Sequence, residues 1–418
     1  MATKYWIGNA SPVAQVDYVT PANVEIGDVF TLGIDAHSVS FTATAATVAN
    51  VTAGLVALWN ASLSPLLSQI TAADETTHIK LTADTAGIPF TTTASVENTS
   101  GGSDDQELTV STEVESFSPN DWSDGDNWSD GSAPTGGDTV VFENGSVPVY
   151  WGLDQSAITL AALYIRASYT GSIGLPATQP NLSGGGFAGS YREYREQYLK
   201  VSATSLIIGE GSGNGSGLLK IDTGANQTAI KVYKTGTPYD STLPSFMWKG
   251  THASNIVDIV SGSFGAAVFT GETATIAALY TRSSTASVAL GPGVTWTAIA
   301  QNGGTVRAES NGTSWTQESG TGYLTRAATL GTLVCNGTFY DQSTGTLTAG
   351  TVQGSGTLDL TGCPGKTISA LDLYAGATLN DPDGKATLSA GIDLNRCTIN
   401  DVTLNLPSNK RITLGSVA

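Results

Sequence analysis

The side chains that most often carry out catalysis or hold a metal are few and scattered in this 418-residue chain. Its histidines lie in separate segments and belong to no metal or nucleophile motif: His37, His78 and His252. Its cysteines all lie in the last quarter, with spacings that fit no zinc motif: Cys335, Cys363 and Cys397. An odd number of cysteines also argues against a disulfide framework. These residues predict no metal site, no cofactor site and no nucleophilic catalysis.

Paired carboxylates are the remaining route to chemistry, because glycoside cleavage uses two acids on either side of the scissile bond. The candidates are Asp222, Asp240, Asp258, Glu272, Glu309 and Glu318. Such acids cannot be paired from the sequence, and a chain with 36 acidic residues supplies candidates by number alone. We expect these side chains to be exposed and solvating, and we predict that the protein is not an enzyme.

A shorter run of carboxylates, in the segment DWSDGDNWSDG, raises the question of calcium. Its acids are Asp121, Asp124, Asp126 and Asp130. A calcium loop places oxygens at alternating positions and closes with a bidentate acid. Asp124 and Asp126 fit that spacing, but Trp128 stands where the next ligand belongs. We therefore favour an Asp/Gly turn whose tryptophans cap a core, with a calcium loop as the alternative.

Aromatic residues in the later part of the chain could stack on sugar rings or seal a subunit interface. They are Tyr191, Tyr194, Tyr198, Trp248, Trp296, Trp315, Tyr323 and Tyr340. Of these two roles, we favour the subunit interface.

Composition narrows the class of protein. The net charge of −18 disfavours nucleic acid, whose phosphates require clustered Lys and Arg. We interpret the small basic cluster of residues 190–200 as a mixed-charge loop, because it also contains glutamates. Apolar runs long enough to span a bilayer are missing, and MATKYWIGNA lacks the apolar core of a secretory signal. We therefore expect neither a membrane partner nor secretion through a signal peptide.

The first part of the chain predicts a compact α+β unit, assigned to residues 1–118. Strand-like alternation recurs in the segments 28–35, 37–44, 77–84, 88–96 and 106–114, and the first two of these predict a hairpin. Between the second and third of these, residues 47–70 show helical spacing, with Thr47 as N-cap and Pro65 as an interruption. One helix would cover one face of a small antiparallel sheet. The core candidates are Phe41, Leu55, Leu58, Trp59 and Phe90.

Residues 119–418 are internally repetitive. TLAALYIRAS at 159–168 recurs as TIAALYTRSS at 275–284 and, more weakly, as TISALDLYAG at 367–376. Short alternating segments separated by Gly, Asn, Asp and Ser predict a solenoid of strands with inward ladders of Leu, Ile, Val and Cys. At about 20–25 residues per coil, the segment would form about 12–15 coils. The fold class is mainly β, and the alternative is a set of β-sandwich or jelly-roll domains.

Three segments resemble parts of two known kinds of protein. GDVFTLGIDAHSVSFTATAATVANVTAGLVALWN and IKLTADTAGIPFTTTAS resemble a small domain of tailed-bacteriophage virion proteins, over roughly residues 10–115. The segment NWSDGSAPTGGDTVVF is similar to the opening turn of right-handed parallel β-helix proteins. The resemblance implies a small virion domain joined to a β-helix, and assembly as a homotrimer.

These resemblances explain how a chain without an export signal has a solvating, Lys-poor composition. Virion proteins are made in the host cytoplasm and released on lysis. We expect a structural virion protein, most simply a capsid decoration (cement) protein that binds the major capsid protein and stabilises the head shell. The alternative is a tail fibre or tailspike adhesin that binds host surface polysaccharide. A bacterial surface adhesin is the third reading, disfavoured by the lack of a signal and an anchor.

Overall fold

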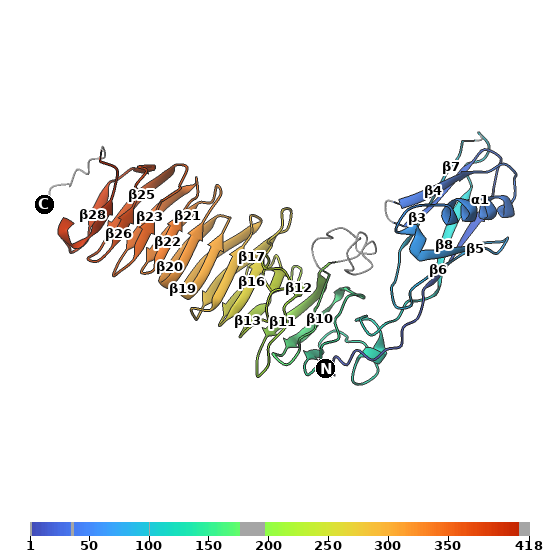
Figure 1. Cartoon of the computed structure of the whole chain (residues 1–418), viewed down its shortest axis with the longest axis horizontal. Helices are drawn as coiled ribbons and strands as arrows, with labels where there is room; N and C mark the ends of the chain where they lie inside the picture. The colour runs from blue at the N-terminus through green and yellow to red at the C-terminus, as the bar shows by residue number, and fades with distance from the viewer. Residues whose placement is uncertain (1, 35–36, 100, 176–196, 409–418) are drawn as a thin grey trace.

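The protein is an elongated rod with a smaller unit at one end (Figure 1). The computed structural model describes residues 2–34, 37–99, 101–175 and 197–408. It is mainly β, with 48% strand and 6% helix. The rod is a parallel β-solenoid of about 12 turns, at the lower end of the predicted range. The predicted fold class is therefore confirmed.

Two long faces of parallel strands form the rod. One face contains β9 (Thr139–Phe142), β10 (Asp154–Ile165), β11 (Leu199–Ile208), β13 (Ala229–Val232), β15 (Ile256–Ile259), β17 (Ala274–Thr281), β19 (Val294–Ala308), β20 (Gly312–Leu324), β21 (Leu330–Cys335), β23 (Thr346–Val352), β25 (Lys366–Leu373), β27 (Ala386–Leu388) and β28 (Ile392–Leu394). The other contains the first residues of β10 and β11, β12 (Leu219–Asp222), β14 (Phe246–Lys249), β16 (Gly262–Ala266), β18 (Ala286–Leu290), the second halves of β19 and β20, β22 (Thr338–Asp341), β24 (Thr357–Asp359), β26 (Thr378–Asn380) and β29 (Thr403–Asn405). Successive coils pair in parallel, as in β17–β19 and β22–β24. This pairing excludes the antiparallel sandwich alternative for the rod.

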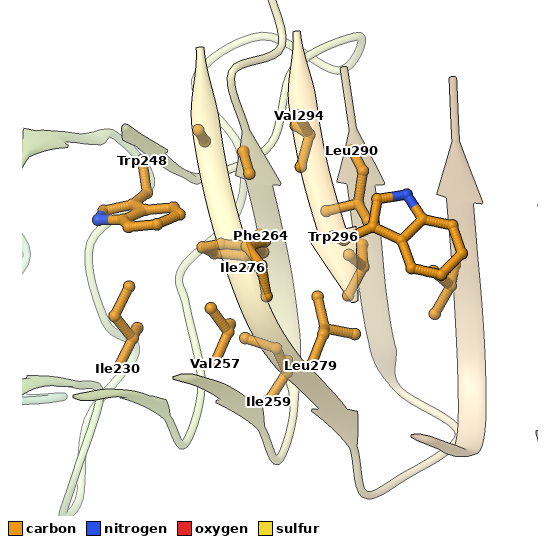
Figure 2. Packing of buried hydrophobic residues seen from close by; sticks show 14 of the residues in the cluster. Ile230, Trp248, Val257, Ile259, Phe264, Ile276, Leu279, Leu290, Val294 and Trp296 are labelled. Atoms are coloured by element: carbon orange, nitrogen blue, oxygen red, sulfur yellow. The ribbon is translucent and has the colours of Figure 1, made fainter. Parts of the chain in front are cut away.

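Inward side chains form continuous apolar ladders along the rod, as predicted. Leu279 pairs with Ile299, which pairs with Trp315, which pairs with Leu333 in the next coil. Each of these side chains is buried. Figure 2 shows the two faces supplying such residues to one core, with Trp248 and Trp296 lying between them. Since a single coil cannot bury its own apolar face, each coil depends on its neighbours.

One inward ladder is polar and was not predicted from the sequence. Thr281, Gln301, Gln317 and Cys335 occupy successive rungs, and all are fully buried. Gln317 Nε2 donates to the carbonyl of Gly320 at 3.1 Å and to that of Thr338 at 3.1 Å. Gln301 Nε2 likewise donates to carbonyls at 3.0 Å. The buried amides thus satisfy the carbonyls of the corner turns, which water cannot reach.

The turns beside this ladder require glycine. Gly304 and Gly320 have φ values of +71° and +92°, in the left-handed region that favours glycine. A Cβ atom on Gly320 would lie 2.5 Å from the carbonyl oxygen of Gly304 in the preceding coil. The two turns can therefore stack directly only because neither carries a side chain.

The Cys335 thiol at the end of this ladder makes stability depend on pH. Burial raises its pKa to about 11. In the unfolded chain, a thiol titrates near about 8.5, so raising the pH favours the unfolded state between these values. We expect the unfolding free energy to be constant below about pH 8.5 and to fall as the pH approaches 11. Urea denaturation across this range, with Cys335→Val as control, checks the prediction; an equal fall in both proteins would contradict it.

The N-terminal unit contains two antiparallel sheets, not the single sheet predicted. One has the order β5-β6-β2-β8 and the other β4-β3-β7. Its elements are β2 (Val16–Ala22), β3 (Val29–Ile34), β4 (His37–Thr42), α1 (Val48–Asn60), the 3-10 turn η1 (Leu67–Gln69), β5 (Ile70–Asp74), β6 (Ile79–Ala83), β7 (Thr92–Glu97) and β8 (Glu107–Val114). The predicted hairpin is confirmed as β3–β4. The sequence did not predict β2, whose alternating pattern is interrupted by Pro21. It did not predict β5 either, because the predicted helix extended to the first residue of this strand.

Helix α1 begins as predicted and ends early. The Thr47 side chain accepts a hydrogen bond from the amide of Asn50, which makes Thr47 the N-cap. Leu55 and Trp59 are buried with Phe90, and Phe41 packs against this core while partly exposed. The prediction for Leu58 was wrong: its side chain is 40% exposed. The buried stripe steps by four residues, through Val51 and Leu55, and position 58 falls beside it.

The first residues of the chain belong to the rod, and the α+β unit follows them in the sequence. Strand β1 (Thr3–Tyr5) pairs in parallel with β9 of the first coil, so the N-terminus lies beside the rod (Figure 1). Trp6 then packs on Trp128, with ring centroids 5.1 Å apart. The predicted domain boundary at residue 1 therefore differs from the structure, in which the α+β unit is inserted between β1 and the main part of the solenoid.

Asn127 joins the chain segments that enter and leave this inserted unit. It lies in the 3-10 turn η2 (Gly125–Asn127) and is fully buried. Its Oδ1 accepts the amide of Ala10 at 2.8 Å, and its Nδ2 donates to the carbonyls of Ser118 and Asp121. Within the solenoid, a second 3-10 turn, η5 (Ile399–Asp401), precedes β29.

Candidate functional site

The most open surface of the α+β unit is the edge strand β8. It lies at the end of its sheet and, among the described strands, pairs only with β2. Seven of its eight residues are exposed. Strand β7 comes close to β8 without pairing with it, so β8 keeps unpaired backbone donors and acceptors with which another strand could pair.

The face of β8 that continues the core is apolar. Val110 pairs with Val19, and paired residues in antiparallel strands point to the same side of the sheet. Val19 is fully buried, whereas Val110 is 39% exposed. Beyond a bulge, Val114 pairs with Val16, lies on the opposite side of the sheet and is also 39% exposed. Phe117, just beyond the strand, is 40% exposed. The apolar face thus extends past the part that the core covers, next to an open strand edge.

The rod carries a groove of about 300 Å³, whose lining includes Lys200, Ser202, Asp222 and Asn226. Charges alternate along this side of the rod, because Asp154, Lys200, Asp222 and Lys249 occupy successive rungs. Lys200 lies 3.8 Å from Asp154, and Lys249 lies 3.5 Å from Asp222. Such a groove offers hydrogen-bond donors and acceptors to a hydroxyl-rich ligand.

A second groove, of about 690 Å³, follows one corner of the rod across three coils. Residues 292–295, 309–311 and 326–328 line it. The Glu309 carboxylate forms an ion pair with Arg326, whose φ of +60° is unusual for a residue other than glycine. This candidate acid is therefore held by a cation.

Most of the other candidate acids are also engaged. Asp258 lies 4.0 Å from Lys231 and 2.8 Å from Arg282. The hydrogen bonds from the backbone amide and hydroxyl of Thr242 lower the pKa of Asp240. Glu318 is exposed and accepts a hydrogen bond from Asn336 at 3.3 Å. These acids are held by partners on the surface of the rod.

Asp222 and Glu272 are the two candidate acids that the structure brings together. Burial raises the pKa of Tyr198, and the nearby Glu272 and Asp222 carboxylates add to the effect. Lys249 lies 4.1 Å from the centre of the Tyr198 ring and pairs with Asp222. Lys249 is therefore the cation that both Asp222 and the Tyr198 ring contact.

The predicted role of the tryptophans was wrong. Trp248, Trp296 and Trp315 are buried inside the solenoid, where they reach neither a sugar nor a second subunit. Tyr198 is also buried. Tyr323 and Tyr340 do face outward, and their rings stack with centroids 4.9 Å apart. Tyr191, Tyr194 and most of the basic cluster lie outside the described residues.

The histidines and cysteines remain apart. His37 contacts Ser64, His78 packs on Tyr18, and His252 accepts the amide of Ser254. Cys335 and Cys363 are buried and Cys397 is partly exposed, all as free thiols. Across residues 2–34, 37–99, 101–175 and 197–408, no three acidic, histidine or cysteine side chains gather as a metal site.

The Asp121–Asp130 segment forms tight turns over an aromatic cap. Asp121 and Asp124 each accept a nearby backbone amide, from Ser123 and Asp126. Asp130 forms an ion pair with Lys4 at 2.6 Å. Trp122 and Trp128 are buried beneath these turns, with ring centroids 4.8 Å apart. This arrangement agrees with the capping turn that the sequence favoured.

The chain matches no protein-family model, no curated protein and no solved structure. None of the helical segments in the described part of the chain has the length and apolar character needed to span a bilayer.

Proposed function

We propose that the protein is a structural component of a virus particle, a capsid decoration protein that binds the major capsid protein through its α+β unit. The observation that carries this proposal is the open edge of β8 with its exposed Val110 and Val114. Strand addition at such an edge supplies backbone hydrogen bonds, and the apolar side chains add affinity. The solenoid then projects away from the shell and does no chemistry.

The viral setting and the homotrimer come from the resemblance described above. Burial of the tryptophans removes most of the aromatic surface that favoured a subunit interface. The homotrimer therefore depends on the resemblance alone, and light scattering on the purified protein tests it.

A tail fibre or tailspike adhesin is the second candidate, because the grooves beside Asp222 and Glu309 offer polar groups to a host glycan. The two functions differ in the amount of protein on each particle. A decoration protein is present in numbers comparable to the major capsid protein, whereas a fibre is present in few copies. Quantitative gel analysis of purified virions separates them.

The β8 edge makes a specific prediction. In the full-length protein, Val110→Lys should reduce binding to particles that lack the protein by about tenfold, because a Lys must be desolvated in an apolar contact. Co-sedimentation measures the bound fraction. Moderate salt should change wild-type binding little, since the contact is apolar and made through the backbone.

The matched control is Leu63→Lys, because Leu63 is an exposed apolar residue of the same unit, outside β8. That variant should bind like the wild type. Equal binding by both variants would show that β8 is not the attachment surface.

A further inference from the structure

Two opposite charges meet inside the C-terminal part of the rod. Asp341 is the last residue of β22, and Lys366 is the first residue of β25. Both side chains are fully buried, and Lys366 Nζ lies 2.7 Å from Asp341 Oδ2. Removing two ions from water costs several kcal/mol for each ion, so an ordinary ion pair at this place requires very good geometry.

The contact lacks the geometry of a hydrogen-bonded ion pair. Asp341 Oδ2 accepts no hydrogen bond in the structure, although Lys366 Nζ is 2.7 Å away. In a well-formed pair, an N–H bond points along an oxygen lone pair. The amine is therefore close to the carboxyl group without being aligned with the oxygen that it approaches.

Ser343 connects the other atoms of the two groups. Lys366 Nζ donates to Ser343 Oγ at 2.7 Å, and Ser343 Oγ donates to Asp341 Oδ1 at 2.7 Å. This chain of hydrogen bonds runs from the ammonium through the hydroxyl to the carboxylate. It provides a path along which one proton can move from Lys366 to Asp341.

We propose that Lys366 and Asp341 form an intramolecular isopeptide bond. Proton transfer through Ser343 produces a neutral amine and a neutral carboxylic acid. Nζ then attacks Cγ of Asp341, the C–N bond forms, and a C–O bond breaks. The departing oxygen leaves as water with two protons. An ammonium and a carboxylate thus become an amide and one water molecule, without any oxidant or other co-reactant.

The surroundings suit this reaction. The fold holds the amine and the carboxyl group in contact. The entropy of bringing them together is therefore lost on folding and does not add to the barrier of the reaction. Cys363 Sγ donates to the Ser343 carbonyl at 3.3 Å on one side. In the next coil, Ala386 pairs with Lys366, and its amide donates to the buried Asp381. These neighbours keep bulk water from the amide.

The bond would link the end of β22 to the start of β25. The last coils of a solenoid have a neighbour on one side only, so they open most easily. A covalent link across the chain between residues 341 and 366 reduces the freedom of this region when it opens. The proposal concerns stability of the rod and does not depend on the proposed virion function.

Intact-mass spectrometry of the denatured full-length protein tests the bond directly. We expect the wild-type mass to be lower than the sequence mass by one water molecule. Tryptic digestion should yield a branched peptide that contains both Asp341 and Lys366. A wild-type mass equal to the sequence mass would overturn the proposal, whatever the variants do.

Variants locate the bond. Lys366→Arg should show no loss of mass, whereas the control Lys385→Arg, at an exposed lysine nearby, should keep it. Asp341→Ala should also show no loss of mass, because it lacks the carboxyl carbon that the amine attacks. Ser343→Ala should contain a smaller linked fraction shortly after synthesis. Loss of water that persists in Lys366→Arg would place the modification elsewhere and contradict the assignment.

Discussion

Replacing Trp6 by alanine is expected to lower the unfolding free energy of the rod by about 3–5 kcal/mol, the usual cost of deleting a buried tryptophan side chain. Trp6 lies far from the first coil in sequence, yet it is 6% exposed and packs on Trp128 and Phe142 of that coil. Its Nε1 also donates to the carbonyl of Val147 at 3.0 Å. Urea denaturation followed by circular dichroism measures the change.

The control for this experiment is the neighbouring residue Tyr5, whose side chain is 40% exposed. Tyr5→Ala should change stability by much less than Trp6→Ala. If both variants unfold at the same urea concentration, the N-terminal segment does not cap the solenoid. A fragment that starts at residue 119 should share the defect of Trp6→Ala, because it lacks both β1 and Trp6.

Replacing Gln317 by leucine is expected to cost about 2–5 kcal/mol, although the two side chains are similar in size. Each buried polar group left without a partner costs about 1–3 kcal/mol. Leucine would remove the donor to the carbonyls of Gly320 and Thr338. It would also remove the amide oxygen that lies 3.2 Å from Cys335 Sγ. The expected result is therefore destabilisation by a more hydrophobic residue.

The matched control is Thr316→Val, at the exposed neighbouring position of the same strand. This variant should have nearly wild-type stability, because its side chain faces solvent. Urea denaturation of both variants compares them under one condition. A Gln317→Leu protein as stable as the wild type would mean that the corner carbonyls find other partners.

Local patterns in the sequence predicted the elements that depend on local interactions. The alternation around Phe30 and Phe41 predicted the β3–β4 hairpin, and Thr47 predicted the start of α1. The repeated segments at 159–168 and 275–284 predicted a solenoid, and they form parts of β10 and β17. These signals are strong because strand alternation, capping and repetition act over a few residues.

The sequence contains a spacing pattern from which the polar ladder could have been predicted. Gln301, Gln317 and Cys335 each follow an apolar residue by two positions and precede a glycine by two or three. Aligning the coils on these glycines would have placed the three side chains on one inward ladder. The acids of the two grooves gave no comparable signal, because their partners come from other coils.

The sequence by itself determined the fold class: a small α+β unit and a solenoid whose coils share a core. Only the tertiary structure decided which side of a strand each residue faces and which coil it meets. Trp296 lies inside because Gly312 of the next coil leaves room for its ring, where a Cβ atom would lie 2.0 Å away. The register between coils likewise brings Asp341 into contact with Lys366. Coil lengths and bulges vary along this chain, so contacts between coils follow from packing of the whole rod and not from spacing in the sequence.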